Sequence, residues 1–145
     1  MMTPQFYLFF KGDCLAAMTH YADTLGGTIE GVFLNRDASP EERMPGPDEL
    51  VMNLAMRLGD TLMMASDNSD EMYERPQGFR IQLETPSAVE FDRVFGALAE
   101  GATAMPMPPG ETFWAERFAM FTDRFGTPWM LSFTGSMAPS DGAVS

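Results

Sequence analysis

The feature that most constrains the fold is a plan of elements that occurs twice in the chain. A predicted helix begins at Asp13 and ends at Gly27, and the same pattern begins at Ser87 and ends at Gly101, 74 positions later. Each helix follows a short apolar strand and precedes three β-rich segments, which predicts strand–helix–strand–strand–strand in each half. Two copies at so long a spacing indicate a duplicated module rather than a solenoid.

Local signals support both helices and align the strands before them. Asp13 can cap the first helix, and Ser87 with Glu90 three residues later has the pattern of a capping box. If the offset of 74 continues into the strands without a gap, residues 7–10 lie opposite residues 81–84. The alignment therefore predicts that equivalent strand residues point to equivalent faces.

The last two strands of each half are predicted as hairpins. Residues 112–133 contain both tryptophans and are β-rich on either side of a turn at 123–126, where Gly126 suits a positive φ. Gly59 and Asp60 form the matching turn of the first half. Residues 35–48, rich in proline and acidic residues, are predicted as a mobile loop, and residues 108–110 as a second loop.

The charge balance narrows the range of partners. The 145 residues include 21 acidic and 9 basic side chains, a net charge of −12. Nucleic acid and anionic membranes both require a basic surface, so neither is an expected partner. No apolar run reaches the ~18 residues of a membrane-spanning helix. The single cysteine, Cys14, excludes an internal disulfide, and a cytoplasmic location is the simplest expectation.

Residue types that bind transition metals are scarce. His20 and Cys14 are each the only residue of their type, whereas zinc, iron and copper sites generally use several. The acids at positions 67, 70, 71 and 74 could hold a hard cation, although a solvated acidic loop is the default interpretation. Fourteen methionines either fill gaps in a core or line an adaptable apolar pocket, and composition does not separate the two.

Seven short stretches, taken in order, carry a resemblance to a known family. They are residues 9–12, 25–27, 57–60, 64–67, 98–101, 112–114 and 122–126. Together they resemble the vicinal oxygen chelate superfamily, which includes glyoxalase I, extradiol dioxygenases and bleomycin or fosfomycin resistance proteins. Within it they are most similar to the PhnB-like branch. The similarity extends from about residue 4 to residue 133.

The resemblance implies an α+β fold of two βαβββ modules, at about residues 4–66 and 78–134. The modules are expected to form a curved mixed sheet with a central cleft on the concave face and helices on the convex face. Residues 1–135 would then form a single glyoxalase-like domain, and residues 136–145 are predicted as a disordered tail.

Enzymes of this superfamily carry His or Glu metal ligands at positions inside the cleft. Carried over by registration, these positions fall at Phe6, Asn53, Arg80 and Met130, none of which is His, Asp or Glu. Three of them offer no metal-binding oxygen or nitrogen, and the charge of Arg80 repels a cation. We therefore expect a degenerate metal site and no cofactor. A divalent metal is expected only if this placement is wrong.

The resemblance also predicts which side chains line a ligand-binding cleft. They are Phe6, Leu8, Asn53, Arg57, Arg80, Gln82, Glu84, Trp114, Met130 and Ser132. Arg80 could pair with a ligand carboxylate or phosphate, or equally with Glu84. Trp114 could stack on an aromatic ligand or pack in the core.

Two classes of function follow. The first is a metal-free, bleomycin-resistance-like homodimer that binds a small organic molecule. The alternative is a superfamily enzyme of the lyase, isomerase, dioxygenase or thiol transferase type with an unknown substrate. It would use Glu84 or Glu116 as a base, or a metal bound in an unusual way.

Overall fold

The structure, a computed structural model, describes residues 1–138 and divides the chain into two compact units, Met1–Arg75 and Pro76–Ser145. Unit 1 contains β1 (Phe6–Phe10), α1 (Cys14–Leu25), β2 (Thr28–Leu34), η1 (Asn35–Asp37), β3 (Val51–Leu58) and β4 (Thr61–Asp67). Unit 2 contains β5 (Ile81–Glu84), α2 (Ala88–Leu98), β6 (Ala104–Gly110), β7 (Arg117–Thr122), β8 (Pro128–Phe133) and η2 (Gly135–Met137). The predicted α+β class and the duplicated βαβββ plan are confirmed.

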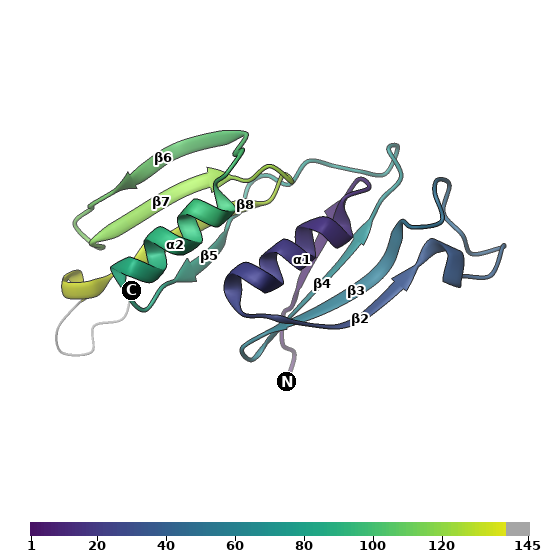
Figure 1. The fold of residues 1–145 in the computed structure, drawn as a ribbon, viewed down its shortest axis with the longest axis horizontal. Coiled ribbons are helices and arrows are strands. Elements are labelled where there is room, and N and C mark those ends of the chain that lie inside the picture. Colours follow the sequence, from purple (N-terminus) through teal and green to yellow (C-terminus); the bar gives the residue numbers. More distant parts are fainter. Residues whose placement is uncertain (139–145) are drawn as a thin grey trace. The chain divides into compact units, whose positions relative to one another are not determined.

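Each unit builds one four-stranded mixed sheet with the same topology. The strand orders are β1-β4-β3-β2 and β5-β8-β7-β6. In each sheet the first strand pairs parallel with the last, and the remaining pairs are antiparallel. Each helix crosses one face of its own sheet (Figure 1). Pro128 lies at the first residue of β8, where a missing N–H is tolerated even in an inner strand.

The helix-covered face of each sheet forms the core of its unit. In unit 1, Phe10 contacts Tyr21 of α1, and Leu54 and Met56 of β3 are fully buried on the same side. In unit 2, Phe121 contacts Phe95 of α2 edge to face, beside the buried Trp129. Because strand residues alternate between faces, their neighbours along each strand form the opposite surface, which we call the open face of the unit.

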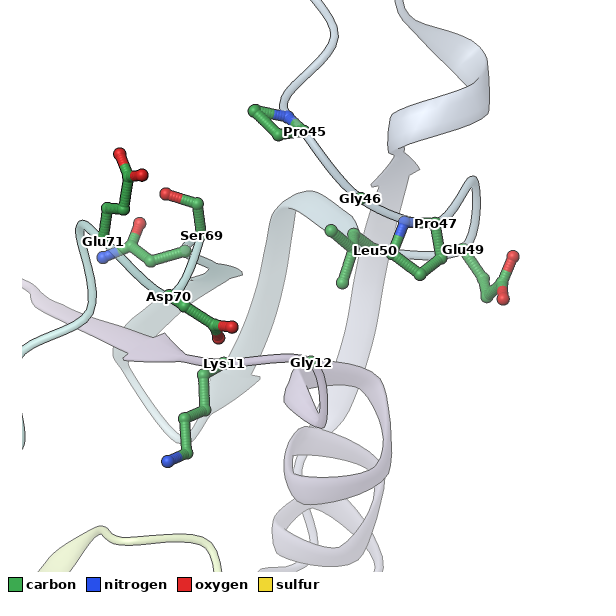
Figure 2. Close-up of a pocket in the computed structure, with 11 residues that line it drawn as sticks. Lys11, Gly12, Pro45, Gly46, Pro47, Glu49, Leu50, Ser69, Asp70 and Glu71 are labelled. Carbon is green, nitrogen blue, oxygen red and sulfur yellow. The ribbon is translucent and has the colours of Figure 1, made fainter.

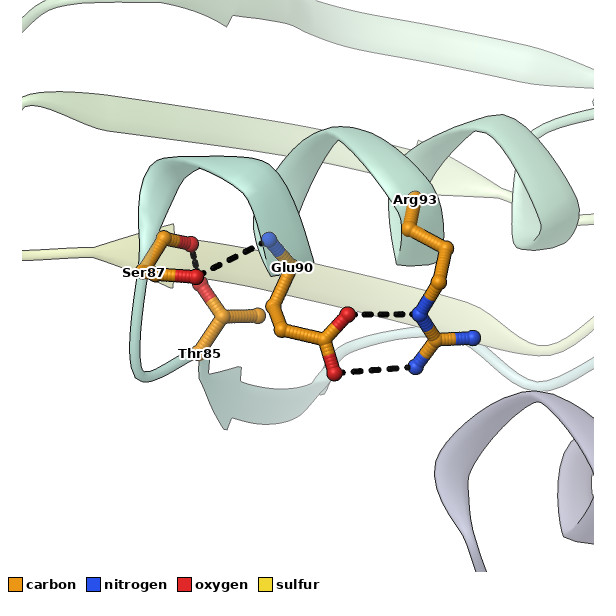
Figure 3. A network of polar contacts seen from close by, with 4 residues as sticks. All are labelled: Thr85, Ser87, Glu90 and Arg93. Atoms are coloured by element: carbon orange, nitrogen blue, oxygen red, sulfur yellow. Dashed lines mark hydrogen bonds and ion pairs between the residues drawn. The ribbon is translucent and has the colours of Figure 1, made fainter.

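The two helices begin in different ways. Ser87 caps α2 by accepting a hydrogen bond from the Glu90 N–H at 3.1 Å, as the sequence predicts (Figure 3). The reciprocal half of the capping box is not observed among the described residues, because the Glu90 carboxylate binds Arg93 at 2.6 Å instead. Thr85 adds a hydrogen bond of 3.4 Å to the Ser87 carbonyl.

In α1, the predicted cap Asp13 makes no side-chain capping hydrogen bond. Asp67, at the end of β4, takes that place. Its Oδ1 accepts from the N–H groups of Gly12 and Cys14 at 2.8 and 3.0 Å, and its Oδ2 accepts from the Val51 N–H at 2.9 Å. One buried carboxylate thus joins the start of the helix to the ends of β4 and β3.

Three local predictions need correction. The loop at residues 35–48 is fixed at its base, because the buried Asn35 side chain bonds Met44 and Pro47 backbone groups and η1 begins there. Residues 108–110 belong to β6, an edge strand that tolerates proline. The described start of the predicted tail forms η2, and residues 139–145 lie outside the described part of the chain.

Within residues 1–138, no helix is long and apolar enough to cross a membrane.

Candidate functional site

The open face of unit 1 is aromatic. Strand register places Tyr7 and Phe9 of β1 on the same side as Asn53 and Arg57 of β3, together with Phe33 of β2. The three aromatic side chains are partly exposed, and the Tyr7 and Phe9 rings lie 4.9 Å apart. The Asn53 amide donates to the Tyr7 hydroxyl at 3.4 Å, and Arg57 forms an ion pair with Glu30 at 3.0 Å. The polar groups of this face are therefore engaged with one another.

Two predicted cleft residues of β1 lie on the other face. Phe6 is in register with Met63, and Leu8 with Ala65, and both partners are buried on the helix side of the sheet. The sequence alignment predicts that Phe6 and Leu8 share a face with Asn53 and Arg57. This prediction is wrong, because the strand pairing places them on opposite faces. Tyr7 and Phe9 occupy that face instead.

A one-residue difference between the units explains the error. Phe10, the last helix-facing residue of β1, lies three positions before Asp13 at the start of α1. Leu83, its counterpart in β5, lies four positions before Ser87. A shift of one residue moves every side chain of a strand to the opposite face. The offset of 74 therefore holds for the helices and fails for the strands before them.

The open face of unit 2 carries a row of methionines. Gln82, Met130, Met120 and Met107 are direct partners across β5, β8, β7 and β6, so their side chains form one line across the sheet. The three methionines are half-buried, whereas Met18, Met56 and Met63 are buried in the core of unit 1. The next line contains Glu84, Ser132 and Phe118. Gln82, Glu84, Met130 and Ser132 thus share a face, as predicted.

Glu84 of this face and Arg80, the residue before β5, have different partners from those expected. The Glu84 carboxylate accepts from the Thr134 N–H and hydroxyl at 2.8 and 2.9 Å, and no Arg80–Glu84 ion pair is observed among the described residues. Arg80 donates from Nη1 to the carbonyl oxygens of Phe121 and Trp129 at 3.0 and 3.4 Å. Its Nε and Nη2 make no hydrogen bond within residues 1–138.

Trp114 stands beside the same face, on the loop between β6 and β7. Its ring lies 5.2 Å from that of Phe118, nearly perpendicular to it, and Phe113 contacts it at 4.6 Å. The Thr112 hydroxyl accepts from the N–H groups of Trp114 and Ala115 at 3.3 and 3.1 Å, which fixes the loop. Trp114 is 40% exposed and Phe113 88% exposed, so neither is a core residue.

The residue types at the predicted metal positions do not fit a metal. No group of three or more His, Cys, Asp or Glu side chains that could hold an ion occurs in the described part of the chain. Asp67 is committed to three backbone N–H groups, and His20 lies on α1 beside Tyr21. With Tyr7 in place of Phe6, the strand positions still offer a phenol and an amide but no carboxylate or imidazole.

A separate pocket of about 560 Å³ occurs in unit 1, beyond the Lys11 and Gly12 end of β1 (Figure 2). The loop before β3 and the loop after β4 form its other walls, and the Asp70 and Leu50 side chains point toward its centre. Lys11 is exposed, and its ammonium lies 5.5 Å from the centre of the Tyr73 ring. The sequence predicts only an acidic loop here. The Pro45-Gly46-Pro47 stretch is the signal in the sequence that could have indicated one wall of the pocket.

Two further titratable groups bear on catalysis. Burial, with added repulsion from Asp67 and Asp13, raises the pKa of the Cys14 thiol far above its usual value, so Cys14 is unsuited to be a nucleophile. A hydrogen bond from the Ser136 N–H lowers the pKa of Glu116, which makes it a weaker base. Neither group supports acid–base or nucleophilic chemistry.

Comparison with known proteins places this geometry in a family. Residues 4–131 match the model of the Glyoxalase/Bleomycin resistance protein/Dioxygenase superfamily. The chain is 30% identical over 135 residues to Protein YjdN of Escherichia coli (strain K12), covering 87% of this chain and 91% of that protein. It is similar to the crystal structure of protein PA1353 from Pseudomonas aeruginosa, with a TM-score of 0.80, 39% identity and coverage of 92% and 98%. A PhnB protein from Bacillus cereus has a TM-score of 0.78 at 22% identity, covering 91% and 99%.

Proposed function

Because the chain belongs to the Glyoxalase/Bleomycin resistance protein/Dioxygenase superfamily, as a PhnB- and YjdN-like member, we propose that it binds a small organic molecule on its open sheet faces without a metal. The supporting observation is the kind of side chain on these faces. Half-buried methionine, exposed aromatic rings, an amide and a guanidinium are present where superfamily enzymes would place His and Glu. Apolar surface with few directional polar groups is typical of small-ligand sites.

Electrostatics favours this proposal over a metal enzyme. Two like unit charges 4 Å apart repel by about 4 kcal/mol at an effective dielectric constant near 20, and a divalent cation feels about twice that from one arginine. The amide oxygen of Asn53 does not offset such a cost, because divalent cations leaving water need several oxygen or nitrogen ligands. An anionic group of an organic ligand is therefore the natural partner of Arg80.

The Bacillus cereus protein is described as a putative 3-demethylubiquinone-9 3-methyltransferase, and we do not propose that activity for this chain. That likeness, at 22% identity, concerns the fold alone, and this chain has no strand, glycine-rich loop and helix in the nucleotide-binding order. We further propose that the protein is a cytoplasmic homodimer, on the basis of the superfamily resemblance and the single cysteine. Light scattering at micromolar concentration tests the dimer, and a monomeric mass would contradict it.

Thermal unfolding with and without ligands tests the main proposal. Purified protein is treated with a chelator, its metal content is measured, and its melting temperature is recorded against a chemically diverse set of small molecules. A ligand that binds only the folded state raises the melting temperature. The proposal predicts such a rise in metal-free protein. A stoichiometric metal that survives purification, with ligand effects that vanish on chelation, would favour the metal-dependent enzyme instead.

A further inference from the structure

The methionine row of unit 2 identifies the class of ligand more closely. We infer that this open face binds a planar aromatic carboxylate, with its ring on the methionines, Trp114 at one edge and Arg80 on the carboxylate. The inference rests on the proposed small-molecule function and narrows it to one chemistry. Every residue that carries it belongs to unit 2, so it depends on a single sheet.

The floor of this site is Met107, Met120 and Met130, aligned across three neighbouring strands. All three are half-buried, and they lie on the face that α2 does not cover. Thioether side chains are flexible and polarisable, and sulfur makes favourable contacts with aromatic rings. A continuous row of them therefore forms an adaptable apolar surface that suits a flat ring.

The wall on one side of the row is aromatic and rigid. Phe118 precedes Met120 by two positions in β7. It is almost completely buried, and its ring packs nearly perpendicular to that of Trp114. The Thr112 hydroxyl bonds fix the loop that presents Trp114. A ring on the methionine row would meet the Trp114 indole without a loop rearrangement, which lowers the entropic cost of binding.

The charge on the other side of the row is positive. Arg80 is anchored by two hydrogen bonds from Nη1 to the Phe121 and Trp129 carbonyls, and its Nε and Nη2 remain available within the described residues. Phe118 and Phe121 lie three positions apart on β7, a span of roughly 10 Å at the rise of a strand. We therefore place an aromatic acid of one or two rings in this span, between Trp114 and the guanidinium. Gln82, at the end of the same row, offers an amide to a polar substituent.

Matched probes test the inference on the full chain. Calorimetry measures the Kd of 2-naphthoate, of its neutral amide 2-naphthamide, and of the saturated, non-planar decahydro-2-naphthoate. We expect 2-naphthoate to bind at least about tenfold more tightly than either comparison compound, since one probe lacks the charge and the other lacks the planar ring. Equal affinity for all three compounds would overturn the inference.

Variants assign the contacts. Arg80→Gln should abolish the preference for naphthoate over naphthamide, and Arg80→Lys should restore part of it. Trp114→Ala should weaken both aromatic probes by about fivefold to tenfold. Asp70→Asn, in the pocket of unit 1, is the control and should change nothing. If 2-naphthoate binding is lost in Asp70→Asn and kept in Arg80→Gln, the site is wrong. Melting temperatures of each variant show whether it is folded.

The outcomes separate this inference from the proposed function. If the thermal screen finds ligands that are not aromatic acids, and 2-naphthoate does not bind, the function stands and the inference fails. If no small molecule binds, both fail. A second copy of the chain on this face would contradict the inference too. Trp114→Ala would then lower the sedimentation coefficient, and 2-naphthoate would not bind the wild-type protein.

Discussion

The two units share one topology and differ in the partners of the polar side chains on their open faces. In unit 1 the polar groups of the open face pair with one another, Asn53 with Tyr7 and Arg57 with Glu30. In unit 2, Arg80 keeps donors that no described group takes, beside a row of apolar methionines. The duplicated plan therefore gives each unit an open sheet face. The side chains on that face determine which unit has hydrogen-bond donors available to a ligand.

The two units also differ in how a buried carboxylate connects their strands, turns and helices. Among the described residues, each unit has one buried aspartate whose carboxylate accepts hydrogen bonds of 2.8 to 3.0 Å from three N–H groups. Asp67 joins the start of α1 to the ends of β3 and β4, whereas Asp123 closes the β7–β8 turn and binds the Trp129 indole N–H at 2.9 Å. Unit 1 thus fixes its helix through a long-range contact, and unit 2 fixes its helix locally through Ser87.

The largest effect is expected from Asp67→Ala. The change leaves three backbone N–H groups without an acceptor and separates α1 from the sheet of unit 1, which should cost about 3–4 kcal/mol of unfolding free energy. Denaturant unfolding measures the loss, and hydrogen exchange should show it in unit 1 first. Asp70→Ala, exposed and three positions away, is the control. Equal losses in the two variants would mean that Asp67 is not the connection.

The next effect concerns the turn that the sequence predicts in unit 2. Gly126 has a φ of 93°, so Gly126→Val should destabilise the protein by about 1–3 kcal/mol through backbone strain. Gly96 lies inside α2, and a Cβ added there would meet open space. Gly96→Ala should therefore raise the unfolding free energy of the protein by about 0.5–1 kcal/mol. Thermal unfolding of both variants gives opposite signs if the assignment is correct. A neutral Gly126→Val would show that the turn tolerates a β-branched residue.

A smaller loss is expected at the cap of α2. Ser87→Ala removes the acceptor of the Glu90 N–H and should cost about 1 kcal/mol. Ser87→Thr keeps a hydroxyl at the same position and should cost much less. Chemical denaturation compares the two. If both variants lose the same stability, the contrast between a local and a long-range helix start is not the correct description.

The smallest effect is a pH dependence confined to unit 2. A hydrogen bond from Arg93 lowers the pKa of Glu90 below its usual value of 4.5. The ionised form is therefore the bound one, so the pair stabilises α2 above pH 4.5 and is lost as the pH falls through the lowered pKa. Amide chemical shifts at the start of α2 should change in that acidic range and become flat in Glu90→Gln. A midpoint at or above 4.5 would contradict the observed pairing.

Local patterns in the sequence predict most of the fold. Helical spacing and capping residues place α1 and α2, and turn glycines place both hairpins, because these signals depend on neighbours in the chain. The face of β1 could not be obtained in this way. It depends on the length of the connection to α1, which is one residue shorter than the connection between β5 and α2. The Cys14 N–H at the start of α1 donates to Asp67, 53 positions later in the chain.

The candidate site was predictable in part for the same reason. Gln82, Glu84, Met130 and Ser132 were placed together because alternation within one strand is reliable. The methionine row was not predicted, because it requires the pairing of β6 with β7 across register shifts at Met107. The partners of Arg80 are backbone carbonyls, which no side-chain pattern reveals.

We propose that the open faces bind an organic ligand and no metal. The most direct measurement is anomalous diffraction from crystals soaked in zinc, nickel or manganese. We expect no anomalous peak within about 2.5 Å of the Asn53 amide oxygen or the Met130 sulfur, since bonded metals lie at such distances from their ligands. A metal peak bonded to either side chain would contradict it.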